Sequence, residues 1–190
     1  MNSPKPYLII ATGRPAAGKS TLAKWLSKEL KLPVVSKDSI RELLFDQLGW
    51  KDREWVMLLG RVSIDLMFYF ARAQLELDHS IIMDNAFHPG PSTPRFLELK
   101  ERTRAEIIQI VCDANSETLL QRFQERAENG NRHPGHGDAK VQDELWKSLT
   151  RELSPLMDVG GKTIVLNTEN FLSLDYSEIL AEVKMYMDKC

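Results

Sequence analysis

The segment 13–20 of the chain has the sequence GRPAAGKS, which fits the pattern G-x-x-x-x-G-K-[ST]. An apolar run at 7–12 precedes it and predicts a buried strand, and a segment at 19–31 that follows predicts a helix. A strand, a tight glycine-containing turn and a helix in this order are the context that the pattern requires. The chain is therefore constrained to a fold in which a buried strand passes through an anion-binding turn into a helix.

The chemistry of this turn accounts for its residue types. Backbone N–H groups must point at the anion, so glycine is needed where a side chain would block the approach. The helix that follows adds its unpaired N–H groups and the positive end of its dipole. Lys19 can reach the outer phosphates of a nucleotide, and the Ser20 hydroxyl is placed to bind Mg²⁺. We predict that nucleotide phosphates are bound by Gly13, Ala16, Ala17, Gly18, Lys19, Ser20 and Thr21.

Length and composition set the class of protein. With 190 residues, of which 43% are apolar and 27% charged, the chain suits one soluble domain, 1–190, with a sizeable core. The net charge of −2 argues against a dedicated nucleic-acid-binding protein. Two cysteines, Cys112 and Cys190, provide neither a disulfide framework nor a zinc-binding spacing. The first apolar stretch is too short for a signal peptide and charged residues interrupt the longest one, 56–73, so we expect a cytoplasmic protein.

Apolar strand-like segments alternate with helical segments along the chain. Strands are expected at 7–12, 33–36, 80–84, 106–112 and 162–167, helices at 19–31, 38–48, 52–78, 91–104, 116–128, 139–153 and 175–189, and a polar loop at 129–138. This alternation predicts an α/β fold with a five-stranded parallel sheet and helices on both faces. Ligands of such sheets bind beyond the carboxyl ends of the strands, so the chemically informative residues are expected there.

Asp38 and Arg41 follow the second expected strand. Asp38 could cap the helix that begins there, or it could aim a carboxylate over the edge of the sheet. Arg41 lies one helical turn later, so both side chains can face the same cleft. Beside a phosphate-binding turn, such a carboxylate would accept the proton of an attacking hydroxyl, and the arginine would hold an anionic group of the acceptor.

Asp84 and Asn85 stand at the end of the third expected strand. An acidic residue here would support Mg²⁺ through water or bind the acceptor, unless it is only a turn carboxylate. The Asp-Glu pair with which many ATP-driven machines polarise water is absent at this point, and the chain has no N-K-x-D guanine signature. A motor and a GTPase switch are therefore disfavoured.

Arg122 and Arg126 lie four residues apart on an expected helix, directly before the polar loop. They could be exposed arginines matched by glutamates. Alternatively, 122–140 could form a lid that brings guanidinium charge onto the transferring phosphate and excludes water. His133 and His136 in this loop could bind a metal, but a turn or a contact with substrate or nucleotide fits better because no further soft ligands lie nearby in the sequence.

Together these motifs resemble those of small P-loop kinases, in the branch that contains phage-type polynucleotide 5′-hydroxyl kinase, the zeta toxins and chloramphenicol phosphotransferase. The resemblance extends from about Tyr7 to Asn167. It implies a three-layer P-loop NTPase sandwich with strand order 2-3-1-4-5, and ATP and Mg²⁺ as cofactors. Ala16 stands where glycine is usual, and the lid sequence HPGH at 133–136 differs from that expected of polynucleotide kinases.

The motifs and the resemblance together assign a role to each site residue. Catalytic roles fall to Lys19, Asp38 and Arg126, nucleotide binding to the phosphate loop and Arg122, acceptor binding to Arg41, Asp84 and Asn85, and metal binding to Ser20. The resemblance further implies that the loop at 167–170 lies near the adenine. The acceptor, in contrast, is not identified by any motif, because the shape of a pocket sets that choice.

The function indicated is an ATP-dependent kinase, which transfers the γ-phosphoryl group to a hydroxyl of a small molecule, nucleoside or nucleotide. Alternatives are an ATP-binding regulatory module or ATPase without its own acceptor, a polynucleotide 5′-hydroxyl kinase, and a toxin that phosphorylates a cell-wall precursor. The net charge and the lack of a basic stripe with interleaved aromatic residues disfavour nucleic acid as the partner. No membrane partner is expected, and the sequence leaves the oligomeric state open.

Overall fold

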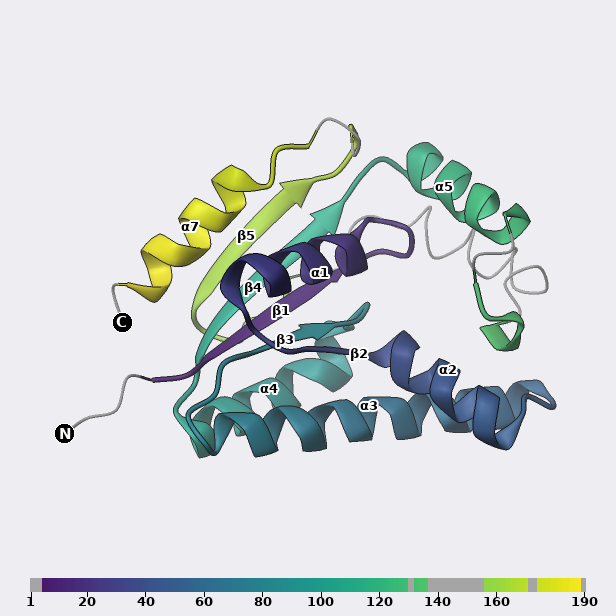
Figure 1. The fold of residues 1–190 in the computed structure, drawn as a ribbon, viewed down its shortest axis with the longest axis horizontal. Helices are drawn as coiled ribbons and strands as arrows, with labels where there is room; N and C mark the ends of the chain where they lie inside the picture. The colour runs from purple at the N-terminus through teal and green to yellow at the C-terminus, as the bar shows by residue number, and fades with distance from the viewer. Residues whose placement is uncertain (1–4, 130–131, 137–155, 171–173, 189–190) are drawn as a thin grey trace.

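The structure, a computed structural model, describes residues 5–129, 132–136, 156–170 and 174–188. Five strands pair in parallel in the order β2-β3-β1-β4-β5 (Figure 1). The strands are β1 Tyr7–Gly13, β2 Val34–Ser36, β3 Ile81–Asp84, β4 Glu106–Asp113 and β5 Lys162–Asn167. The expected strand order and the three-layer α/β architecture are confirmed.

The three inner strands, β3, β1 and β4, are buried on both faces, which explains why they consist mostly of apolar residues. Along β1, Tyr7, Ile9 and Ala11 pack in one core cluster. Leu8 and Ile10 pack in a second cluster. Since successive side chains of a strand point to opposite faces, these clusters are the two cores of the sandwich.

Helices cover both faces of the sheet. They are α1 Lys19–Leu30, α2 Lys37–Leu48, α3 Arg53–Leu75, α4 Pro89–Thr103, α5 Ser116–Glu128 and α7 Ser177–Met187. Residues of α1, α5 and α7 enter the first cluster, and residues of α3 and α4 enter the second on the opposite face (Figure 1). α2 packs against α3 and buries one residue, Phe45, completely.

The strand register brings three chain connections to one edge of the sheet. Asp84 at the end of β3 is in register with Ala11 of β1 on one side and with Ser36 of β2 on the other. The phosphate loop follows β1, and α2 begins directly after β2. Both connections therefore lie next to the turn that follows β3.

Several element ends differ from those expected. α2 begins at Lys37 and has Ser36 as its N-cap, so Asp38 lies in the first turn and its alternative role as the N-cap is wrong. α4 begins at Pro89. Proline is well suited to the first helical position, because the N–H group that it lacks would have no intrahelical partner there. α3 ends at 75, three residues before the expected end, and the chain then reaches a left-handed conformation at Asp78, with φ of 59°.

The polar loop expected at 129–138 contains a 3-10 turn at Pro134–His136. The helix expected at 139–153 lies outside the described residues, as does part of the expected lid at 122–140. Among the residues that the structure describes, no helix combines the length and the apolar character that crossing a membrane would require.

Candidate nucleotide-binding and phosphoryl-transfer site

The turn between β1 and α1 uses backbone conformations that favour glycine. Gly13 and Gly18 have φ values of 132° and 83°. A Cβ atom at Gly13 would lie 2.0 Å from the carbonyl oxygen of Cys112 on β4, so only glycine fits. Ala16 has a φ of 61°, a left-handed conformation that costs a residue with a Cβ atom about 1–2 kcal/mol. The first hydrogen bonds of α1 run from the N–H groups of Thr21 and Leu22 to the Gly18 carbonyl oxygen, so the N–H groups of Lys19 and Ser20 lie before them and can face an anion.

Arg14 fixes the phosphate loop to the end of β4. Its Nε donates to Asp113 Oδ1 at 2.7 Å, its Nη1 donates to the Ser116 hydroxyl at 3.2 Å, and its Nη2 donates to the Ala114 carbonyl oxygen. The Lys19 ammonium group in turn donates to the Arg14 carbonyl oxygen at 2.7 Å. Arg14 therefore holds both the loop backbone and the position of its lysine, a role that the motif does not identify.

Lys19, the first residue of α1, is electrostatically coupled to three other predicted site residues. Burial lowers the pKa of Lys19, and the carboxylates of Asp84 and Asp38 counteract this shift. The guanidinium group of Arg126 adds to the lowering. The couplings show that a lysine from α1, carboxylates that follow β2 and end β3, and an arginine from α5 converge.

Asp84 ends β3 and is only 4% exposed. The hydroxyl groups of Ser20 and Ser36 donate hydrogen bonds to its carboxylate. Burial raises the pKa of Asp84, while these hydrogen bonds and the charge of Lys19 act in the opposite direction. Hydroxyl and carboxylate oxygens are ligands that Mg²⁺ accepts together with water and phosphate, so Ser20 and Asp84 could hold this ion beside the phosphate loop.

The turn that follows β3 is held against the end of β1. The backbone N–H of Asn85 donates to the Ala11 carbonyl oxygen at 3.2 Å, and the backbone N–H of Phe87 donates to the Thr12 hydroxyl at 3.0 Å. Asn85 is half-buried. The predicted acceptor residue Asn85 thus lies in a turn tied to the strand that carries the phosphate loop.

Asp38 lies between two arginines. Arg41 Nη2 is 3.3 Å from Asp38 Oδ1, and Arg132 Nη2 is 3.3 Å from Asp38 Oδ2. Burial alone would raise the pKa of Asp38, but the charges of Arg132 and Arg41 outweigh burial and lower this pKa. The carboxylate is therefore ionised at neutral pH, while its side chain remains 46% exposed and within reach of a ligand.

His136 contacts the same two guanidinium groups. Its Nδ1 lies 3.1 Å from Arg132 Nη2 and is also hydrogen-bonded to Arg41 Nη2, while its Nε2 lies 2.8 Å from Glu42 Oε1. Guanidinium groups only donate and ionised carboxylates only accept, so Nδ1 is the acceptor and Nε2 carries the proton. Burial, together with Arg132 and Arg41, lowers the pKa of His136 to about 3, which keeps the ring neutral.

The 3-10 turn rests on Phe45 of α2. The ring of His133 stacks on Phe45 with 5.3 Å between the ring centres, and the ring of His136 meets it edge-on at 5.6 Å. A Cβ atom at Gly135 would lie 2.5 Å from Phe45 Cδ2, so the turn packs as closely as glycine permits. Within the described parts of the chain, no group of three or more His, Cys, Asp or Glu residues could hold a metal, and these histidines bind α2 instead.

The two predicted lid arginines have different surroundings. Arg122 Nη2 donates to the carbonyl oxygens of Thr168 and Glu169, both at 2.8 Å. Arg126 lies close enough to Lys19 to lower the pKa of that residue. The guanidinium group of Arg126 also lies over the Phe123 ring at 5.2 Å, whereas Arg122 fixes the loop that follows β5.

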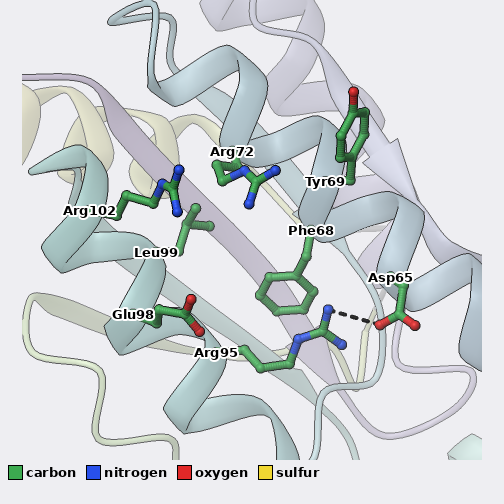
Figure 2. A pocket seen from close by; sticks show the side chains of 8 residues that line it. All are labelled: Asp65, Phe68, Tyr69, Arg72, Arg95, Glu98, Leu99 and Arg102. Carbon is green, nitrogen blue, oxygen red and sulfur yellow. Dashed lines mark ion pairs between the residues drawn. The ribbon is translucent and has the colours of Figure 1, made fainter.

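A cavity of about 310 Å³ lies between α3 and α4, on the face of the sheet opposite α1 (Figure 2). Its arginine side chains are paired with acidic residues. Arg95 contacts Asp65 at 3.0 Å and lies over the Phe68 ring, and Arg102 contacts Glu76 at 2.7 Å. No residue of the phosphate loop, α2 or α5 lines this cavity. The cavity is therefore separate from the phosphate loop, whose backbone N–H groups and lysine are the groups suited to an anion.

The structure thus groups most of the predicted site residues at one edge of the sheet and adds others. The residues that the sequence analysis missed are Arg14, Ser36, Arg132 and the role of His136. Arg132 could have been noticed as a third cation of the predicted lid, next to the HPGH segment. No local pattern marks Arg14, because its partner Asp113 is 99 residues away.

A parallel sheet of order 2-3-1-4-5, a phosphate loop after its central strand and polar residues at the adjacent strand ends define a P-loop protein of the kinase-like, nucleotide-binding class. The AAA domain family AAA_33 matches residues 8–156. The chain belongs to this family.

Three known proteins show how far the similarity extends. A protein from Chloroflexus aurantiacus j-10-fl, provisionally described as a kinase, is 34% identical, with a TM-score of 0.87 over 96% of this chain and 98% of that chain. Kti12 from Chaetomium thermophilum, solved in complex with ADP-AlF3, shares the fold with a TM-score of 0.67 at 15% identity over 95% of this chain and 98% of its own. Adenylate kinase 8 of Mus musculus is 27% identical over 77 residues, which make up 40% of this chain and only 15% of that protein.

Proposed function

We propose that the protein is an ATP-dependent kinase that transfers the γ-phosphoryl group to a hydroxyl of a small molecule, nucleoside or nucleotide. The observation that carries this proposal is the convergence of Lys19, the Ser20–Asp84 pair and Asp38 at one edge of the sheet. These groups come from three separate connections between strands and helices. The similarity to the Chloroflexus aurantiacus protein supports the same class of activity.

On the donor side, the backbone N–H groups of the phosphate loop and the ammonium group of Lys19 would bind the β- and γ-phosphates of ATP. Ser20 and Asp84 would hold Mg²⁺, which neutralises charge on the phosphate oxygens when bound. Arg126 would face the group in transfer, because it lies near Lys19. Arg122 would hold the loop after β5 in place for the adenine.

On the acceptor side, Asp38 would orient the hydroxyl and take its proton as the hydroxyl oxygen attacks the γ-phosphorus. The bond from that phosphorus to the bridging oxygen breaks, and ADP leaves with the bonding electrons. Because the pKa of Asp38 is lowered, this carboxylate is a weak base that contributes mainly by orienting the hydroxyl. Arg41, which binds Asp38, would hold an anionic group of the acceptor.

Replacing Asp38 with Asn separates a kinase from an ATP-binding regulatory module. A non-hydrolysable ATP analogue should still bind, while phosphoryl transfer across a panel of acceptors should fall by about 10²–10⁴-fold. Asp65→Asn removes a carboxylate that pairs with Arg95 on the opposite face, so this control should leave both quantities unchanged. Unchanged ATP turnover in the Asp38→Asn protein would exclude the proposed role and favour a module or ATPase without an acceptor.

The acceptor panel also distinguishes the remaining alternatives. It should contain sugars, hydroxy acids, nucleosides, nucleotides and an oligonucleotide with a free 5′-hydroxyl group. Transfer to the oligonucleotide in preference to all small molecules would identify a polynucleotide kinase. Growth arrest on expression in bacteria, abolished by Asp38→Asn, would instead point to a toxin.

A further inference from the structure

Helix α3 carries apolar residues on the side that faces away from the sheet. Its buried residues enter the second core cluster, as in other amphipathic helices. On the opposite side, where a surface helix normally carries polar residues, apolar residues recur at spacings of three and four. These residues form the α3 stripe, which consists of Leu58, Val62, Leu66, Tyr69, Phe70 and Ala73.

The α3 stripe is open to contact with another molecule. Leu58, Leu66, Tyr69 and Phe70 are each between 40% and 64% exposed. A contiguous exposed apolar surface of this kind marks an interaction site. Figure 1 shows α3 along the outer side of the molecule, and α3 and α1 cover opposite faces of the sheet. A partner seated on the stripe would therefore leave the phosphate loop accessible.

Four charged residues of α3 and its C-cap border the stripe on the side next to α4. Asp65 binds Arg95 of α4 at 3.0 Å (Figure 2), and Glu76 binds Arg102 of α4 at 2.7 Å. Positive and negative charges alternate along this border, in the order Arg61, Asp65, Arg72 and Glu76. A helix that lies on a membrane has a border rich in lysine and arginine instead, so these charges favour a protein partner.

The order of the border charges is complementary to itself when the helix is reversed. Two parallel copies of α3 would place like charges level with each other, whereas two antiparallel copies place each positive charge near a negative one. We propose that the α3 stripe binds a second copy of the chain, with the two α3 helices antiparallel about a two-fold axis. The protein is then a symmetric dimer, and the phosphate loops lie away from the interface.

The apolar residues fit the same arrangement. When Leu66 lies level with the partner's Tyr69, Val62 lies level with the partner's Ala73. A branched side chain therefore meets a small one on each side of the two-fold axis, which lets the helices approach closely. Burial of the stripe would supply the affinity of the dimer.

The same register brings opposite charges together. Asp65 lies within two residues of the level of the partner's Arg72, and Arg61 lies equally close to the level of the partner's Glu76. Two residues of a helix span about 3 Å, a distance that these side chains can bridge. The two-fold axis repeats both pairs, so four ion pairs would set the direction and the register of the helices.

Analytical ultracentrifugation of the 190-residue chain at about 0.1–100 µM measures the assembly. We expect a mass of twice the 21.7 kDa of one chain, reached within this range or present throughout it. A chain that is still a monomer at about 100 µM would overturn the inference.

Leu66→Glu tests whether the α3 stripe forms the interface. It would place a carboxylate of each chain in the apolar contact, so the dimer should weaken by about 100-fold or more. Leu97→Glu is the matched control, because Leu97 is 44% exposed on α4 against 42% for Leu66 and does not line the cavity next to α3. This control should dimerise like the wild type. A dimer that Leu66→Glu leaves intact would use another surface and would overturn the inference.

Charge reversal tests the antiparallel direction. Arg61→Glu would bring two acidic residues together across the interface, and Glu76→Lys would bring two cations together. Each variant alone should therefore dimerise about tenfold or more weakly than the wild type. A mixture of the two should recover the dimer, because each reversed charge then meets the other. A labelled Arg61→Glu chain should pair less with Glu101→Lys, a matched reversal at an exposed position of α4 outside the border.

The outcomes are independent of the proposed function. Thermal unfolding shows whether each variant is folded, and if Glu76→Lys is not, the comparison of Arg61→Glu with the wild type decides. An Arg61→Glu protein that dimerises like the wild type, or a mixture of two folded charge variants that stays monomeric, would overturn the antiparallel dimer. Failure of the protein to bind an ATP analogue would remove the kinase proposal and leave this inference standing.

Discussion

The ammonium group of Lys19 donates a 2.7 Å hydrogen bond to the carbonyl oxygen of Arg14, five residues earlier in the phosphate loop. Arg14 is itself bound to Asp113 at the end of β4, so the lysine is held through the loop by the central part of the sheet. Burial lowers the pKa of Lys19, which means that the folded chain binds this proton less tightly than the unfolded chain does. The buried charge of Lys19 therefore lowers the free energy of unfolding, although the same charge would bind the phosphates of a ligand.

Replacing Lys19 with Met should leave the unfolding temperature unchanged or raise it. At neutral pH the lysine is charged in the unfolded chain, and methionine removes the burial penalty of that charge from the folded state. Lys24→Met, at an exposed position of α1, is the matched control for thermal unfolding. A drop of more than about 4 °C in the Lys19→Met protein alone would show that the lysine stabilises the loop instead.

Ala16→Gly should stabilise the protein. The left-handed backbone at Ala16 costs the folded state about 1–2 kcal/mol, which glycine would relieve. The greater freedom of glycine in the unfolded chain offsets about 0.5–1 kcal/mol of this gain. We expect a net gain of about 0.5 kcal/mol in denaturant unfolding. Ala17→Gly, at a buried position without a positive φ, should have the opposite sign. A loss of stability in both proteins would rule out strain at Ala16.

Asp84→Asn should change the dependence of nucleotide binding on Mg²⁺. The amide retains an oxygen for the hydroxyl groups of Ser20 and Ser36 but removes the charge that faces the ion. The Mg²⁺ concentration for half-maximal binding of an ATP analogue should rise by about 10–100-fold, and chelation of the ion should abolish turnover of the wild type. An unaltered Mg²⁺ requirement would show that Asp84 does not support the ion.

His136 should make the stability of the chain depend on pH. Its pKa is lowered from 6.5 to about 3, so between these values the unfolded chain binds a proton that the folded chain excludes. Stability is therefore lost as the pH falls below about 6.5, by up to about 1.4 kcal/mol for each pH unit. Denaturant unfolding at several pH values should show a steeper loss for the wild type than for His136→Asn, which cannot take up this proton. Parallel losses in the two proteins would argue against a neutral, buried ring.

The phosphate loop could be predicted because its constraints are local. Gly13, Gly18 and Lys19 lie within seven residues, and the strand and helix around them follow from their own apolar patterns. The place of Asp84 at the same edge was also foreseeable, because parallel strands end together. The strand order, by contrast, came from the resemblance to small P-loop kinases and not from any pattern in the chain.

The partners of Asp38 could not be predicted in the same way. Helix α2 begins one residue earlier than expected, so Asp38 faces Arg41 and Arg132 instead of capping the helix. The contacts of Arg132 and His136 with α2 join segments more than 90 residues apart, and they depend on the packing of Gly135 against Phe45. The spacing of residues along the sequence does not predict contacts of this kind.

Equilibrium binding of a labelled, non-hydrolysable ATP analogue with Mg²⁺ tests the central claim most directly. Wild-type protein and Lys24→Met should each bind one analogue per chain, and Lys19→Met should bind it about tenfold or more weakly, because a charge-assisted contact to phosphate is lost. Equal binding by the wild type and Lys19→Met, or no binding by the wild type at millimolar analogue, would contradict the assignment of the phosphate loop as the nucleotide site.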